Sequence, residues 1–144
     1  MKINYLALPN GNKLISYDVH DYKSVEIEGI LYMIDGGQEH YIRTSHSNLV
    51  KKASIHKLIS VIREEYTWVS IFNKDLSRRE KPIKRLLKDL EDEHLYSIIS
   101  YLKNRLKVIK EKENMSDSIF QLKFIIQIMK AEIKYREKES NKTR

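Results

Sequence analysis

The chain has 144 residues, of which 41% are hydrophobic and 33% charged, and this composition is typical of one globular domain rather than of a disordered chain. No stretch reaches the roughly 18 apolar residues that a membrane span needs, and the absence of cysteine excludes disulfides, so stability must come from packing. The formal net charge of +7 favours an anionic partner, but lysine and glutamate alternate as on solvated helix faces and no usual nucleic-acid motif is present, so nucleic acid is not expected as a partner.

The first fifty residues have the pattern of short strands joined by tight turns. Pro9-Asn10-Gly11-Asn12 and Asp35-Gly36-Gly37 are turn signals, because glycine adopts positive φ at little cost. The pattern predicts an N-terminal antiparallel β-sheet of about five to six short strands, in which the first fifty residues form a meander of four or five. The expected strands cover 3–8, 13–19, 25–27, 30–34 and 40–44.

A short helix and an extended segment are expected next. Apolar residues at three- and four-residue spacing predict a helix over 54–65, with Ser54 as its N-cap. The aromatic and β-branched run 66–72 then indicates extended chain. Residues 73–81 are the most polar stretch of the chain and are interpreted as a basic loop, after which Pro82 marks a new start and the chain stays extended to about residue 90.

Two long helices are predicted in the C-terminal half. Residues 91–110 carry leucine and isoleucine at the spacing of one buried face, with acids in the first turn and cations towards the end, as the helix dipole favours. Residues 117–138 carry two neighbouring apolar faces, and a helix of that kind normally packs on both sides. We therefore expect an α+β domain spanning 1–144 that forms a homodimer or larger oligomer through its C-terminal helices, with a frayed tail at 139–144.

No motif in the sequence specifies an enzyme. GxSxG, a glycine-rich phosphate loop, HExxH and a cysteine nucleophile are all absent. His20 lies between Asp18 and Asp21, which are metal-ligand types, but no second histidine follows at short spacing and a turn at a strand end explains the same residues. We therefore expect no catalytic residue, no metal and no cofactor.

One set of residues suits an anionic, aromatic small molecule. Aromatic rings stack on a nucleobase, and arginine binds phosphate through two parallel hydrogen bonds. The alternative, that the aromatic residues belong to the core beside a solvated charged loop, stays open. The candidate ligand-binding residues are Arg43, Trp68, Phe72, Lys88, His94 and Arg105.

Three stretches, taken in order, resemble a group of short proteins encoded by tailed bacteriophages. They are SYDVHDY with LYMIDGGQEHYIRTS near the start, EYTWVSIFNK with LLKDLEDEHLYSII in the middle, and FQLKFIIQIMKAEIKYR near the end. Within that group the chain most resembles the first family of Thoeris anti-defence proteins, over most of its length. The resemblance implies an N-terminal antiparallel sheet, paired C-terminal helices and a ligand held where two subunits meet. Residues 73–81 contain no glycine, where the family is expected to have one.

The resemblance implies a binding protein that is not an enzyme. Members of that family trap the cyclic ADP-ribose signal made by bacterial TIR-domain proteins, so that it cannot activate an NAD-depleting effector, and some also bind cyclic oligonucleotides. We therefore expect a cyclic nucleotide-like ligand bound without degradation, self-association and no membrane partner. The N-terminus lacks a secretion signal, so the expected location is the cytoplasm of the infected bacterial host. One alternative is a phage protein that binds a host protein or nucleic acid through its basic surface, and another is an enzyme that degrades the same signal.

Overall fold

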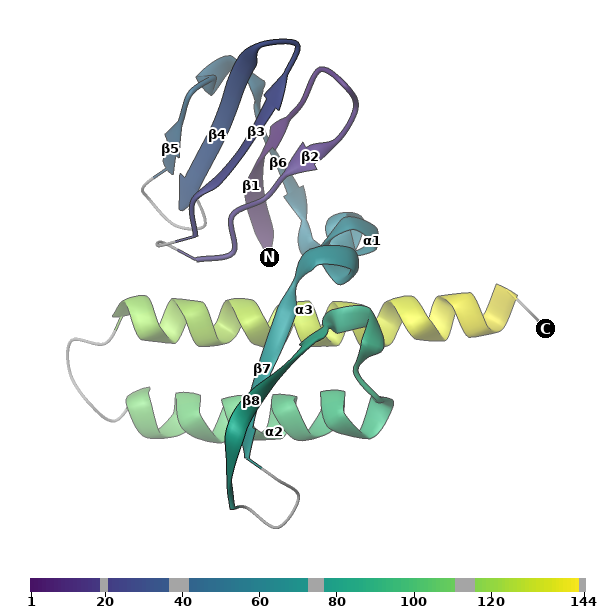
Figure 1. Cartoon of the computed structure of the whole chain (residues 1–144). Helices are drawn as coiled ribbons and strands as arrows, with labels where there is room; N and C mark the ends of the chain where they lie inside the picture. Colours follow the sequence, from purple (N-terminus) through teal and green to yellow (C-terminus); the bar gives the residue numbers. More distant parts are fainter. Residues whose placement is uncertain (19–20, 37–41, 73–76, 111–115, 143–144) are drawn as a thin grey trace.

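A computed structural model describes residues 1–18, 21–36, 42–72, 77–110 and 116–142, without the side chains of 71–72 and 116–118. Within these residues, two three-stranded antiparallel sheets and one two-stranded hairpin accompany three α-helices. The two three-stranded sheets lie to one side of the two long C-terminal helices, and the β7–β8 hairpin crosses both helices in this view (Figure 1). The predicted α+β class and the two long C-terminal helices are confirmed.

The first sheet has its central strand at the start of the chain. Strand β1 (Lys2–Ala7) pairs on one side with the short β2 (Lys13–Leu14) and on the other with β6 (Val50–Ser54), which follows the 3-10 turn η1 (Ser47–Leu49). The sequence analysis missed β6, because VKKAS has a single apolar residue before two lysines. Five residues of β6 pair with β1, and the strands form two separate sheets. The predicted single meander is therefore wrong.

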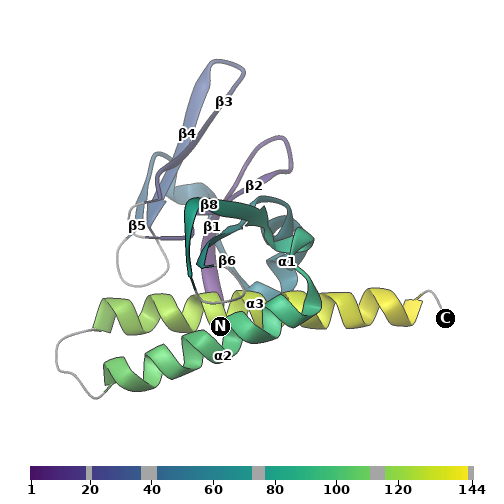
Figure 2. The same cartoon turned by 60° about the horizontal axis from the view of Figure 1, so that its bottom comes forward.

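The second sheet consists of β3 (Lys23–Ile27), β4 (Ile30–Gly36) and β5 (Ile42–Thr44) in that order. Glu28 and Gly29 both adopt positive φ at the turn between the first two strands, a conformation that Gly29 adopts at little cost. Figure 2 shows the β3–β4 hairpin extending away from the helices. The expected strand start at 40–41, and His20, lie outside the described residues.

Helix α1 (Ile55–Glu65) lies where the sequence predicts it. The Ser54 hydroxyl accepts a hydrogen bond from the Lys57 backbone N–H at 3.2 Å, so the expected N-cap is confirmed. Its four buried residues form one helix face, which packs on the C-terminal helix within the largest hydrophobic cluster. They are Ile55, Leu58, Ile59 and Ile62.

The segment after α1 is a β-hairpin rather than an extended run and a loop. Strand β7 (Thr67–Phe72) pairs antiparallel with β8 (Arg78–Leu86), so residues 78–81 of the expected loop are strand, and 73–76 lie outside the described residues. Pro82 lies inside β8, close to the point where the register shifts between Ser70 and Phe72. A proline has no N–H to donate, and a two-stranded sheet has only edge strands, which tolerate it.

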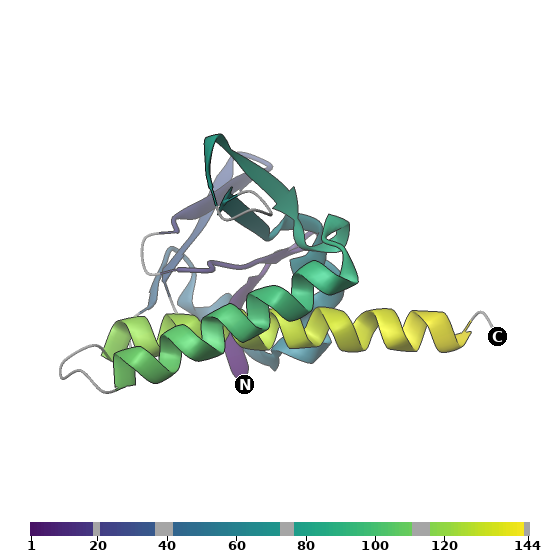
Figure 3. The same ribbon diagram turned by 90° about the horizontal axis from the view of Figure 1, so that it is seen from below.

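A short 3-10 turn, η2 (Leu87–Asp89), leads into α2 (Asp92–Lys110), which lies beside α3 (Ser116–Lys142). Figure 3 shows α3 running past the start of α2. The tail expected to fray from residue 139 is helical to Lys142. None of the described helices is both long and apolar enough to cross a membrane.

The two apolar faces predicted for α3 are accounted for inside the chain. Helices α1 and α2 both pack on α3, and Phe124, Ile128, Met129 and Ala131 are fully buried between them. The two apolar faces of α3 therefore do not require a second subunit to cover them. A smaller cluster around Leu6, with Leu8, Tyr32 and Ile34, holds the two N-terminal sheets together.

Candidate functional site

Strand β8 carries the densest positive charge among the described strands. Its sequence RREKPIKRL has five basic residues and one acid. Because this strand is paired with β7 alone, its side chains are exposed or half-buried along its whole length. The hairpin therefore presents a row of cations next to the start of α2. The basic residues are Arg78, Arg79, Lys81, Lys84 and Arg85.

Trp68 lies directly across the hairpin from Arg85. The two residues are cross-strand partners, so their side chains lie on the same face of the hairpin. Trp68 is half-buried and packs against the largest hydrophobic cluster, whereas Arg85 is exposed. The indole is thus fixed by the core on one side and adjoins a cation on the other.

His94, in the first turn of α2, faces the same cations. Burial lowers the pKa of its imidazole, the positive charges of Arg85 and Arg79 lower it further, and Glu91 opposes them. The imidazole is therefore neutral at pH 7 and has a donor N–H to offer. We call Arg79, Arg85 and His94 the basic cluster.

The basic cluster is suited to binding an anion. The Arg85 guanidinium can bind phosphate oxygens through two parallel hydrogen bonds, Arg79 adds positive charge, and the neutral imidazole adds a donor without adding repulsion. Trp68 offers an aromatic surface beside Arg85 for a nucleobase. Partial burial of His94 strengthens these interactions relative to open solvent.

Two other predicted site residues, Lys88 on η2 and Arg105 on α2, are placed differently. The Lys88 ammonium on η2 donates to the Glu64 carboxylate at 2.6 Å, so its charge is already paired. Arg105 is exposed on α2 and follows His94 by eleven residues, about 16 Å along the helix axis, on nearly the same side. A small molecule at the basic cluster reaches Arg105 only if it extends along α2.

The remaining two predicted residues are not brought to the basic cluster by any described contact. Arg43 is exposed on β5, across from Asp35 on β4, and Figure 1 shows β5 at the opposite end of the molecule from α2. Phe72 pairs with Arg78 at the backbone, but its side chain lies outside the description. Arg79 and Arg85 belong to the basic stretch of the sequence but were not among the six candidates, since only the hairpin register places Arg85 opposite Trp68.

Arg136 of α3 holds the segment that connects Arg85 to His94. Its Nη2 donates to the carbonyls of Leu87 and Lys88 at 3.1 and 3.3 Å, and its Nη1 donates to the Asp92 carboxylate at 2.8 Å. The end of β8 and the start of α2 are thereby fixed to the same side chain.

Glu132 aligns Arg136 and is itself fully buried. It accepts from Arg136 Nε at 2.9 Å, and from Arg63 Nε and Nη2 of α1 at 2.8 and 3.0 Å. The Arg63 guanidinium also stacks 4.4 Å from the Tyr135 ring centroid, and bonding to Glu132 raises its pKa. From the sequence, Glu132 only interrupts an apolar run, and that interruption is the one signal of its role.

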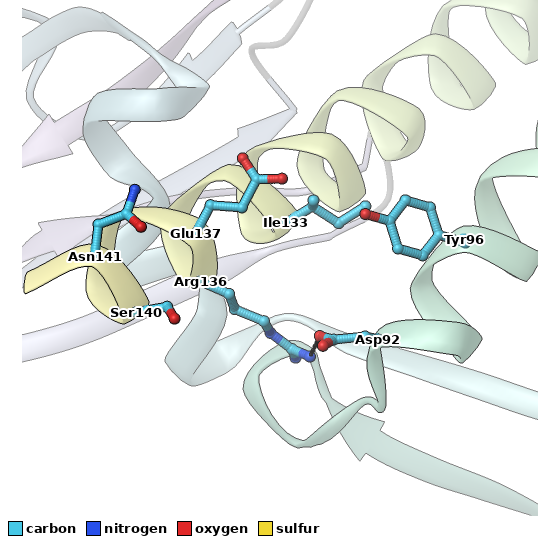
Figure 4. A pocket seen from close by; sticks show the side chains of 7 residues that line it. All are labelled: Asp92, Tyr96, Ile133, Arg136, Glu137, Ser140 and Asn141. Atoms are coloured by element: carbon cyan, nitrogen blue, oxygen red, sulfur yellow. Dashed lines mark hydrogen bonds and ion pairs between the residues drawn. The ribbon is translucent and has the colours of Figure 1, made fainter. Parts of the chain in front are cut away.

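A pocket of about 370 Å³ lies on the other side of this network, between the first turn of α2 and the last turns of α3 (Figure 4). Arg136 points at Asp92 across it, while Glu137 adds a second carboxylate to its wall. Because the guanidinium is already bonded to Asp92, Glu132 and two carbonyls, this pocket offers an anion little positive charge. The basic cluster is the better candidate.

Comparison of the chain with models of known protein families, with curated proteins and with solved structures finds no match.

Proposed function

We propose that the protein binds an anionic, cyclic nucleotide-like small molecule at the basic cluster and releases it unchanged. The observations that carry the proposal are the pairing of Trp68 with Arg85 across the hairpin and the positive charges of Arg85 and Arg79 acting on His94. The two arginines are suited to the phosphates of such a ligand, and the indole to its base.

Binding without turnover is part of the proposal. The basic cluster pairs no nucleophilic side chain with a general base, and the Ser97 hydroxyl one turn along α2 donates to the Glu93 carbonyl at 3.0 Å instead. The groups of the cluster supply donors and positive charge, which hold an anion in place. Together with the resemblance to Thoeris anti-defence proteins, this favours a phage protein that sequesters a cyclic ADP-ribose isomer in the host cytoplasm.

Self-association remains part of the proposal, but through α2 rather than α3. Tyr101 and Val108 are each 55% exposed and lie two helical turns apart on one side of α2. We expect Tyr101→Asp to lower the mass measured by sedimentation equilibrium, whereas Tyr22→Asp, at a tyrosine 53% exposed on another part of the chain, leaves it unchanged. A wild-type protein that sediments as a monomer at all concentrations removes this part of the proposal.

The test is a thermal-shift panel with cyclic ADP-ribose isomers, cyclic di- and trinucleotides, NAD and ADP-ribose at about 150 mM salt. A ligand at about a thousand times its dissociation constant adds roughly 4 kcal/mol, which is several degrees for a chain of this size. Arg85→Gln and His94→Gln should abolish the shift, and Lys57→Gln, an exposed lysine on α1, should not.

Recovery of the ligand separates binding from catalysis. A bound molecule released by boiling should be chemically identical to the one added. A converted product instead indicates an enzyme. A shift that survives in Arg85→Gln and His94→Gln places the ligand elsewhere on the protein.

A further inference from the structure

Between residues 119 and 136, the side chains that helix α3 exposes to solvent are all lysines, and from Glu137 to Lys142 the helix is exposed all round. Lys123, Lys130, Lys134 and Lys138 are all exposed and recur at steps of seven, four and four residues, which keeps them on one side of the helix. We call these four residues the lysine stripe. Its first and last lysines lie fifteen positions apart, about 22 Å along the helix axis.

The composition of this stripe is unusual for a solvated helix face. Lys130, Lys134 and Lys138 succeed one another at i,i+4, where like charges repel and destabilise the helix. Glu137 is the one acid at the edge of the stripe in the described part of α3. No member of the stripe forms an ion pair among the residues that the structure describes.

The positive potential of the stripe extends onto α1. Burial lowers the pKa of His56 in the first turn of that helix, and the charges of Lys134 and Lys138 lower it further. His56 therefore lies within the field of the stripe. The surface is separate from the basic cluster, with which it shares no residue.

We propose that the lysine stripe binds the phosphate backbone of duplex nucleic acid without regard to base sequence. Lysine presents a mobile point charge, which suits phosphates at variable positions rather than bidentate reading of a base. A straight row of cations on a rigid helix matches a linear polyanion. This inference goes beyond the proposed function and revises the expectation that nucleic acid is no partner.

Two other polyanions fit the stripe less well. Single strands are usually held by stacking on aromatic side chains, and membrane surfaces by apolar side chains that enter the lipid. All of the large hydrophobic residues that the structure shows as exposed lie outside α3. The stripe therefore offers charge alone, which is what a duplex backbone requires.

The number of lysines fixes the expected salt dependence. Four phosphate contacts give a slope of log K against log salt of about −3.6 for duplex DNA. Affinity should then fall about 150-fold between about 50 and about 200 mM salt. His56, which is neutral at pH 7, adds nothing to this slope.

The test is fluorescence anisotropy with a random DNA duplex of about 20 base pairs, titrated across that salt range. The test variant changes all four lysines of the stripe to glutamine. The control variant changes four exposed lysines elsewhere, so that the net charge falls equally. The control positions are Lys51, Lys52, Lys103 and Lys107.

We expect the wild-type protein and the control to give slopes near −3.6, and the stripe variant to lose most of the slope and of the affinity. The stripe variant should unfold at the same denaturant concentration as wild type or higher, because it removes like-charge repulsion, and the thermal shift with the small molecule should be unchanged. Equal losses of DNA affinity in the two variants would mean that only the net charge of the protein matters, and would overturn the proposal. Tighter binding to a single strand of equal length, or to vesicles containing phosphatidylserine, would overturn the assignment to duplex.

Discussion

The buried carboxylate of Glu132 is a point where a single polar substitution should cost substantial stability. Glu132→Gln keeps the volume of the side chain and removes its charge. Two guanidinium groups, 18% exposed on Arg63 and 22% exposed on Arg136, then lose the carboxylate that they share. An uncompensated buried charge is far more costly than a broken surface ion pair.

The structure sets the size of the effect. Removing one partner of a buried pair costs about 3–5 kcal/mol. Arg136 keeps its bonds to Asp92 and to two carbonyls, and Arg63 keeps the Tyr135 ring, so we expect the lower end, about 3 kcal/mol. For a chain of this length that corresponds to a fall of about 6–12 °C in Tm.

Urea denaturation followed by circular dichroism measures this change directly. Glu139→Gln is the matched control, because Glu139 lies on the same helix but is exposed and, among the described residues, forms an ion pair with Lys142 alone, at 3.1 Å. Its loss should stay below about 0.5 kcal/mol. Adding Arg63→Met to Glu132→Gln should recover part of the loss, since an apolar replacement removes one uncompensated charge. A cost below about 1 kcal/mol for Glu132→Gln would refute this reasoning.

Three further changes have signs that the structure fixes. The pKa of His94 in the folded protein lies below its usual 6.5, so its contribution to stability is present above pH 6.5 and is lost as the pH falls through the folded pKa. Urea midpoints measured from about pH 7 to about pH 5 should therefore decline less for His94→Asn than for wild type. Parallel curves for the two proteins would contradict this. The buried Ser16 hydroxyl accepts a hydrogen bond from the Gly36 N–H at 3.0 Å and donates one to the Asp21 carbonyl at 2.6 Å. Ser16→Ala should therefore lower the free energy of unfolding by about 1–3 kcal/mol and speed amide hydrogen exchange at Gly36. An unchanged exchange rate at Gly36 would argue against that role. Gly29→Ala should cost about 1 kcal/mol in thermal unfolding from its φ of +81° alone, since nothing lies within 4 Å of an added Cβ, and a neutral result would mean that the turn relaxes.

The helices were predictable because their signals are local. Ser54 and the four buried residues of α1, and the apolar period of α2, lie within a few turns of one another and need no tertiary information. The grouping of the strands was not predictable in this way. Strand β6 pairs with β1 about fifty residues earlier, and its two lysines hide the pattern of an edge strand that pairs with β1.

Some residues of the candidate site could be predicted from their chemical types, but their spacing in the sequence did not show which of them lie together. Trp68 and His94 were chosen as an aromatic group and a donor, yet only the hairpin register and the entry into α2 relate them to Arg85 and Arg79. Arg43 was grouped with them because a sequence does not indicate which sheet a strand joins. Glu132 was passed over because burying a carboxylate is favourable only where two arginines from separate parts of the chain surround it.

The central claim is tested most directly by isothermal titration of a cyclic ADP-ribose isomer into wild type and Arg85→Gln, with recovery of the ligand by boiling. We expect saturable binding to wild type, loss of binding in Arg85→Gln while Lys57→Gln binds normally, and return of the ligand chemically intact. Absence of binding by every cyclic nucleotide tested, or equal binding by Arg85→Gln, would contradict it.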